Sequence, residues 1–248
     1  MSFARLDRAP GYRLLAEAIE REILEGRLKP GDRLPTETEF AEQFAGNRST
    51  VREGIRLLEE SGLVRREEGR RLFVARPETA ALAQRMSNAM VMHQVTFREL
   101  WETMMALEPM AAELAAANAT PDHLAALAAN LAETRAVVAD TQEVARLDIA
   151  FHALVVEAAG NRALLLSRDA LGRLFYPAFE AVISGLPAAP QRLLTAHSAI
   201  FEGIRAGDAA EARRWMERHI MDFKRGFERM GLDFAAPIAL PTGQEKTK

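Results

Sequence analysis

Regular apolar spacing, interrupted only at short turns, is the feature that most constrains the fold of residues 78–233. The interruptions fall at residues 120–122, 160–161, 185–187 and 207–208, where glycine, proline, asparagine or aspartate breaks a helical pattern. Connections this short pack neighbouring helices antiparallel. The segment therefore predicts an all-α antiparallel bundle of about six or seven helices.

Residues 1–77 combine helix and strand patterns and predict a separate, smaller domain. A capping box formed by Thr36 and Glu39 begins a short helix, and a second helix over residues 49–60 follows a tight turn. Two short strand candidates come next. Two helices joined by a tight turn and followed by a hairpin are typical of a winged helix-turn-helix. The fold class is therefore mainly α, and we expect residues 234–248 to form a disordered tail.

Composition excludes several classes of protein. The chain has no cysteine, which excludes disulfides, a thiol nucleophile and thiolate metal ligands. It has no apolar run of about 18 residues and no secretory signal pattern, so we expect a cytoplasmic protein without membrane contact. Its formal net charge of −3 provides no overall attraction to nucleic acid. Any DNA binding must therefore come from a local basic surface.

The second helix of the predicted helix-turn-helix carries such a surface. One of its faces is apolar, whereas Arg48, Arg52 and Arg56 follow at spacing four along another face. Guanidinium groups can bind phosphates or the O6/N7 edge of guanine in the major groove. Ser49 and Thr50, at the start of the helix, can donate to phosphate. A solvated arginine face on an ordinary surface helix remains the alternative for the arginine row taken alone.

The predicted hairpin adds basic residues around Gly69, with Arg70 among them. A basic wing tip can reach a neighbouring minor groove or the DNA backbone. Together with the tight turn and the capped preceding helix, this hairpin favours a DNA-binding interface over a solvated helix face.

Residues 12–75 resemble the DNA-binding domain of the GntR superfamily of bacterial transcription regulators. The resemblance rests on three segments, residues 23–35, 47–53 and 60–64, in the family's order and spacing. The chain departs from the family pattern at Thr38, where an arginine is usual, and near Arg70, where a second glycine or a proline is usual. The resemblance and the basic pattern together predict a DNA-binding set of Arg33, Thr36, Thr38, Arg48, Ser49, Thr50, Arg52, Gly69 and Arg70.

Four polar residues of the second domain fall on apolar helix faces. Asp148 and His152 are four residues apart, so they share one face, and His197 and His219 lie within the apolar stripes of two other helices. A single inward histidine is more often a hydrogen-bonded core residue than a ligand. A buried carboxylate, however, is costly unless it is paired, and a divalent cation would satisfy it together with neutral imidazoles.

The second domain resembles the effector-binding domain of the FadR subfamily of the same regulators. The carrying segments are residues 148–152, 158–161, 197–208 and 216–219. The resemblance implies that Asp148, His152, His197 and His219 hold one divalent ion per chain, with zinc, nickel or manganese as candidates. It also implies a homodimer that binds a pseudo-palindromic operator in double-stranded DNA.

The effector is expected to be a small molecule, with an organic acid as one candidate. Many members of the subfamily bind an acid through an arginine at the position of Met104, so the methionine here favours a larger or more apolar ligand. Met104, Met105 and Asn161 are the predicted pocket residues. Core packing by the two methionines, and a turn role for Asn161, are the alternatives.

The sequence therefore predicts a ligand-responsive transcription regulator, a repressor rather than an enzyme. One alternative is a metal-dependent hydrolase or lyase in which Asp148 and the three histidines activate water. Another is a regulator that senses the metal ion itself, or in which the ion is only structural.

Overall fold

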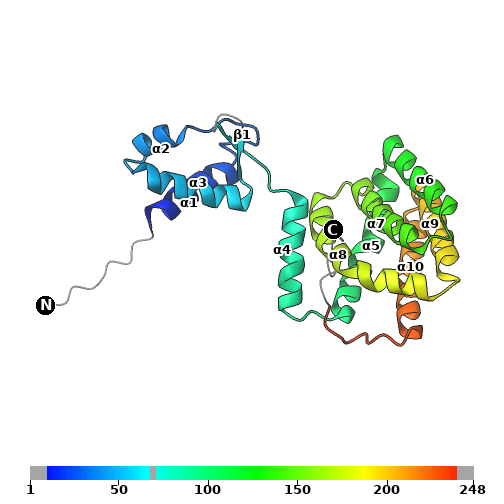
Figure 1. Ribbon diagram of the computed structural model, residues 1–248. Coiled ribbons are helices and arrows are strands. Elements are labelled where there is room, and N and C mark those ends of the chain that lie inside the picture. The colour runs from blue at the N-terminus through cyan, green and yellow to red at the C-terminus, as the bar shows by residue number, and fades with distance from the viewer. Residues whose placement is uncertain (1–9, 68–70, 239–248) are drawn as a thin grey trace. The chain divides into compact units, whose positions relative to one another are not determined.

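The computed structural model of the 248-residue chain describes residues 10–67 and 71–238 (Figure 1). The chain divides into two compact units, residues 1–78 and 79–248. Within the described residues, none of the helices is both long and apolar enough to cross a membrane.

The N-terminal unit contains three helices and a two-stranded antiparallel hairpin (Figure 1). Its elements are α1 (Gly11–Leu24), α2 (Glu37–Gln43), α3 (Arg48–Ser61), β1 (Val64–Glu67) and β2 (Arg71–Val74). The predicted capping box begins α2, since the Thr36 hydroxyl accepts from Glu39 N while the Glu39 carboxylate accepts from Thr36 N. Helix α3 ends at Gly62, whose positive φ of 78° suits glycine.

The core of this unit lies where α1 crosses α3. Leu15 and Ile19 of α1 are buried with Val51 and Ile55 of α3. The helices approach closely at Gly54, where an added Cβ would lie 2.7 Å from the Leu15 side chain and 2.8 Å from the Tyr12 carbonyl oxygen. This packing holds the opposite face of α3 toward solvent.

The C-terminal unit contains seven helices within its described residues, which confirms the predicted fold class. They are α4 (Thr79–Met92), α5 (Phe97–Asn118), α6 (Pro121–Ala136), α7 (Thr141–Ala158), α8 (Arg162–Gly185), α9 (Ala189–Ala206) and α10 (Ala209–Arg229). Helix α5 packs against α7, α9 and α10, and α8 packs between α4 and α7 (Figure 1). Local signals begin several helices, including the cap of Thr120 before Pro121 and that of Asp208.

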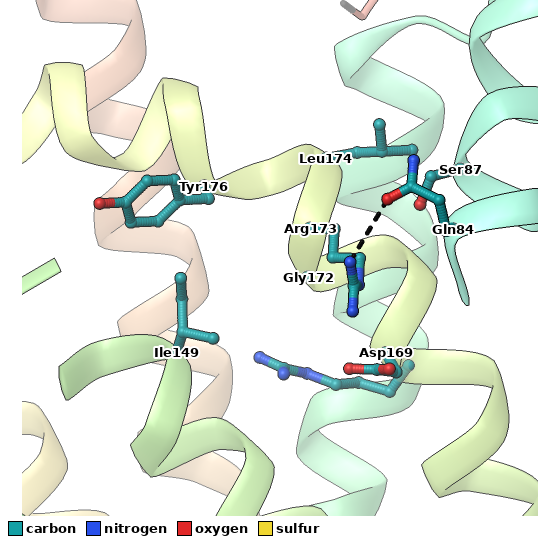
Figure 2. A pocket seen from close by; sticks show the side chains of 9 residues that line it. Gln84, Ser87, Ile149, Asp169, Gly172, Arg173, Leu174 and Tyr176 are labelled. Atoms are coloured by element: carbon teal, nitrogen blue, oxygen red, sulfur yellow. Dashed lines mark hydrogen bonds between the residues drawn. The ribbon is translucent and has the colours of Figure 1, made fainter. Parts of the chain in front are cut away.

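Helix α8 contains Pro177, which lacks the N–H that would bond to the carbonyl of Arg173. In Figure 2 the ribbon of α8 loosens between Leu174 and Tyr176, just before this proline. The irregular segment borders the cavities described below.

The expectation of a disordered tail from residue 234 is wrong for residues 234–238. The Phe234 ring packs against Phe97 and Trp101, and Ile238 is buried. The Ile238 N–H donates to the Val95 carbonyl at 2.9 Å. Apolar side chains and backbone pairing with the start of α5 hold this segment, whereas residues 239–248 lie outside the described part of the chain.

Candidate functional site

The exposed face of α3 presents two arginines without protein partners. Arg48 and Arg52 are exposed, and neither forms a hydrogen bond or ion pair with any described residue. Arg56 continues the same row but differs, because its guanidinium pairs with Glu53 at 2.6 Å and with Glu60. The structure therefore separates the predicted arginine row into two free cations and one neutralised cation.

Ser49 and Thr50 also differ in their surroundings. Ser49 is exposed, whereas Thr50 is half-buried with its methyl group facing Gly11 of α1. The Thr50 N–H donates to the Asn47 side chain at 2.7 Å, so this helix-start donor is already used. Only Ser49 of the pair is open to a ligand through its side chain.

The remaining predicted DNA-binding residues lie before α2 and in the wing. Arg33 and Thr38 are exposed, and the backbone of Arg33 pairs with Phe73 of β2. The Thr36 hydroxyl is engaged in the α2 capping box. Gly69 and Arg70 lie outside the described residues.

Ion pairs neutralise much of the basic charge at the base of the wing. Arg66 of β1 contacts Glu37 of α2 and Glu59 of α3, each at 3.0 Å. Arg65 pairs with Glu67. The sequence pattern therefore overstates the free positive charge of this hairpin.

The second site is a buried cluster in which α7, α9 and α10 bring four potential metal ligands together. Asp148 and His152 lie on α7, His197 on α9 and His219 on α10, and all four side chains are buried. Asp148 Oδ1 lies 3.2 Å from His197 Nε2, 3.6 Å from His219 Nε2 and 3.7 Å from His152 Nε2. His219 Nε2 in turn lies 3.1 Å from His152 Nε2 and 3.3 Å from His197 Nε2. One ligand atom of each residue therefore faces a common point.

These separations suit a metal ion. Around a tetrahedral ion with bonds of about 2.0–2.1 Å, ligand atoms lie about 3.3–3.4 Å apart. Asp148 Oδ1 is fully buried and accepts no well-directed hydrogen bond within the described part of the chain. A buried carboxylate oxygen without a donor is costly, and a cation at the common point would satisfy it. The cluster can therefore hold a divalent metal ion.

Glu108 of α5 orients the cluster and was missed in the sequence analysis. Its side chain is 0% exposed, and its Oε2 lies 2.9 Å from His152 Nδ1. Because the carboxylate can only accept, Nδ1 carries the donated proton and Nε2 faces the other ligands. Glu108 falls on the apolar stripe of α5 with Met104 and Ala111, which is the same signal that identified Asp148.

The charge states follow from burial and from these neighbours. Burial alone would raise the pKa of Glu108, but His152 and Arg168 lower it to about 2. Burial would likewise raise the pKa of Asp148, but the surrounding histidines hold it well below its usual range. Burial lowers the pKa of His197 to about 3, which leaves a neutral imidazole ready to ligate. For His152, burial acts to lower the pKa, but Glu108 and Asp148 outweigh it and raise the pKa above its usual value.

Two cavities adjoin the cluster and share a wall that includes Ile149, Arg168, Gly172 and Tyr176. The inner cavity, of about 30 Å³, reaches Asp148, His152 and His219 and is otherwise lined mainly by aromatic residues. The outer cavity, of about 250 Å³, lies between α4, α7 and α8 (Figure 2).

Of the three predicted pocket residues, only Met104 lines one of these cavities, the inner one. Met105 packs against the hydrophobic core of the bundle. Asn161 caps α8, where its side-chain oxygen accepts from Ala163 N and Leu164 N at 3.1 Å. Arg168, which lines both cavities, was not predicted.

Comparisons with known proteins agree with both units. Residues 12–74 match the family model described as bacterial regulatory proteins, gntR family, and residues 99–222 match the FCD domain. The HTH-type transcriptional regulator LutR of Bacillus subtilis is 29% identical over 202 residues, which cover 80% of this chain and 92% of that protein. The galactonate operon transcriptional repressor of Escherichia coli is 31% identical over 201 residues, which cover 78% and 87% of the two chains.

A solved structure titled Streptococcus agalactiae GntR matches with a TM-score of 0.62 at 25% identity, covering 86% of this chain and 99% of that one. These relatives are named as transcription regulators, a class that is not enzymatic, so the prediction of a regulator rather than an enzyme is confirmed. The chain belongs to the GntR family of bacterial regulatory proteins and carries an FCD domain after its winged helix-turn-helix.

Proposed function

We propose that this regulator is a repressor that binds a pseudo-palindromic operator as a homodimer, and that a small molecule bound beside one divalent ion per chain controls operator affinity. The observation that carries the proposal is the convergence of Asp148, His152, His197 and His219 beside two cavities, in a chain whose winged helix exposes unpaired arginines. The name of the galactonate operon repressor supports the choice of repression. Binding to bacterial operator DNA places the protein in the cytoplasm.

Helix α3 is the recognition helix of this proposal. Arg48 and Arg52 project from its exposed face, where they can bind phosphates or guanine edges, and Ser49 adds a donor at the helix start. Arg33 and Thr38 supply flanking contacts, while Thr36 and Thr50 contribute through the backbone positions that they cap or pack. Gly69 and Arg70 are assigned to the wing contact.

Operator binding can be tested without a known operator. Selection from a random duplex library should yield an inverted repeat whose half-sites are one helical turn apart or a multiple of it. On the selected duplex, Arg48→Ala and Arg52→Ala should each weaken binding at least tenfold, and the salt dependence should fall by about one released counterion per lost phosphate contact. Arg56→Ala is the matched control, because that guanidinium is already paired with glutamates. Equal binding by all three variants would refute the assignment.

The metal half of the proposal rests on the donor set. One carboxylate oxygen and three imidazole nitrogens suit zinc, nickel or manganese. A bound ion would supply a Lewis-acidic position for an oxygen atom of the effector, while the chain's own residues bind and orient that molecule. Elemental analysis of protein purified without added metal should give one ion per chain, and His152→Ala and His197→Ala should lose it.

Operator affinity measured with metal alone distinguishes an effector site from a metal sensor. If metal and a metabolite are both required to change operator affinity, the metabolite is the signal. If metal alone changes it, the regulator senses the ion. A change in thermal stability with no change in operator affinity indicates a structural ion.

A further inference from the structure

Arg168 of α8 is a buried cation with unused hydrogen-bonding capacity. Its residue is 5% exposed, and its Nε donates to Glu108 Oε1 at 2.8 Å. Within the described residues, this is the only hydrogen bond that the guanidinium makes, so Nη1 and Nη2 have no protein acceptor. Both cavities include Arg168 in their walls.

Unused donors on a buried guanidinium are unusual, because a charge removed from water is costly unless it is paired and hydrogen-bonded. The Nε bond to Glu108 satisfies one edge of the planar group. The terminal nitrogens remain available for a carboxylate, which matches guanidinium geometry with two parallel hydrogen bonds.

The charge of the centre also favours an anion. Glu108 and Asp148 each contribute one negative charge, and Arg168 contributes one positive charge. A divalent ion among neutral imidazoles would leave the buried centre with one net positive charge. A monoanion in the adjoining cavity would balance it.

The space beside Arg168 is kept open by Gly172, one turn further along α8. A Cβ at this position would lie 3.1 Å from Arg168 Nη1 and 3.2 Å from its Cζ. Almost any side chain here would therefore press on the guanidinium. Glycine lets the guanidinium face the shared wall of the two cavities.

The outer cavity limits the size and polarity of the ligand. Its volume of about 250 Å³ corresponds to about eight water molecules at about 30 Å³ each, well below the space of a drug-sized ligand. Asp169 and Arg173 line it together with Tyr176, and Arg173 Nη1 reaches Gln84 Oε1 of α4 at 3.4 Å (Figure 2). These groups can bind hydroxyl substituents on a short carbon chain.

We propose that Arg168 anchors the carboxylate of a small, hydroxylated acid effector, whose remaining atoms occupy the outer cavity. This proposal rests on the proposed function and names the ligand class of that site. The anchor comes from α8, whereas the corresponding α5 position, Met104, carries no charge. The absence of an arginine at Met104 therefore does not remove acid recognition.

Glu108 links this anchor to the metal centre. Its two oxygens join Arg168 Nε on one side and His152 Nδ1 on the other. An anion that offsets the charge of Arg168 makes Glu108 a stronger acceptor for His152, and this strengthens the imidazole as a ligand. Acid and metal therefore bind with positive coupling, and by linkage each tightens the other by the same factor.

Calorimetry on the full-length, zinc-loaded protein tests the anchor directly. The probes are acetate, glycolate and gluconate, each compared with its neutral amide. We expect at least one acid to bind wild type at least tenfold more tightly than its amide. Arg168→Gln should weaken that acid at least thirtyfold and leave the amide unchanged, while Arg162→Gln, an exposed arginine of the same helix, should behave as wild type.

Gly172→Ala carries the test if Arg168→Gln does not fold, because it retains the charge and only crowds the guanidinium. It should weaken acid binding several-fold. Zinc affinity, measured by competition with a chromophoric chelator, should rise on adding the acid in wild type, and Gly172→Ala should reduce that rise in proportion to its loss of acid affinity.

Two results would overturn the proposal: an acid that binds Arg168→Gln or Gly172→Ala as tightly as wild type, or a wild type that does not distinguish any of the acids from its amide. Operator binding by the same preparations separates this failure from failure of the proposed function. A wild type that binds operator but shows no acid selectivity overturns the anchor alone. A wild type that binds no operator overturns the proposed function.

Discussion

Replacing Glu108 with glutamine tests how far this buried carboxylate controls the metal centre. Glu108→Gln preserves size and shape but removes the charge. In the native side chain both oxygens accept, one from His152 Nδ1 and the other from Arg168 Nε. A glutamine has one acceptor oxygen and one donor amide, so it can accept from only one of these partners and must face the other with its NH₂ group.

The expected cost has two parts. Removing one partner of a buried ion pair costs about 3–5 kcal/mol, because Arg168 keeps its charge at 5% exposure. For a domain of this size, about 3 kcal/mol lowers the Tm by roughly 6–12 °C. Loss of the carboxylate that orients a metal-bound histidine reduces metal affinity about 10–100-fold, equivalent to about 1.4–2.7 kcal/mol.

Scanning calorimetry of the metal-free protein and zinc titration against a chelator measure the two parts separately. Glu102→Gln, an exposed position on the same helix, is the control and should change neither quantity. Glu108→Gln combined with Arg168→Met should recover much of the lost stability, because no unpaired charge stays buried, but not the metal affinity. A zinc affinity of Glu108→Gln within twofold of wild type would refute the orienting role.

Three further predictions follow from the geometry. Gly54→Ala should destabilise the N-terminal unit by about 1–3 kcal/mol in denaturant unfolding, since its Cβ would lie 2.8 Å from the Tyr12 carbonyl oxygen; an unchanged midpoint would contradict the close crossing of α1 and α3. Zinc at 100 times its dissociation constant should stabilise wild type by about 2.7 kcal/mol, seen as a higher Tm that a chelator reverses, whereas His197→Ala should show no zinc-dependent shift. Zinc affinity should rise with pH until it passes the raised pKa of His152 and then level off, because the folded metal-free protein gains stability from protonated His152 at low pH and loses it as pH rises through that pKa; competition titrations at pH 6, 7 and 8 that gave equal affinities would contradict this.

Much of the fold could be predicted because its signals are local. Thr36 with Glu39, and Thr120 before Pro121, begin helices through contacts within one turn, so neighbouring residues suffice to identify them. The ordering of residues 234–238 could not be predicted, because it depends on pairing with Val95 and on rings that are distant in the sequence.

The candidate metal centre was predictable in part. Asp148 and His152 share a helix face at spacing four, which any helix imposes. That His197 and His219 meet them was implied by family resemblance, since no periodicity within one helix fixes the distance to another. Glu108 and Arg168 lie on apolar stripes of their helices, but only their separation of 2.8 Å gives them a role.

The sequence by itself determined which residues are helical, which faces are apolar and which charged groups each face carries, because these follow from backbone periodicity and contacts a few residues apart. Only the tertiary structure decided which charges are free. Arg66 is neutralised by Glu37 and Glu59 from two other helices, while Arg48 and Arg52 keep an open face, and Arg168 is bonded along one edge alone. The physical reason is that hydrogen bonds and ion pairs require contacts of about 3–4 Å, and for groups on different elements that distance is set by how the elements pack.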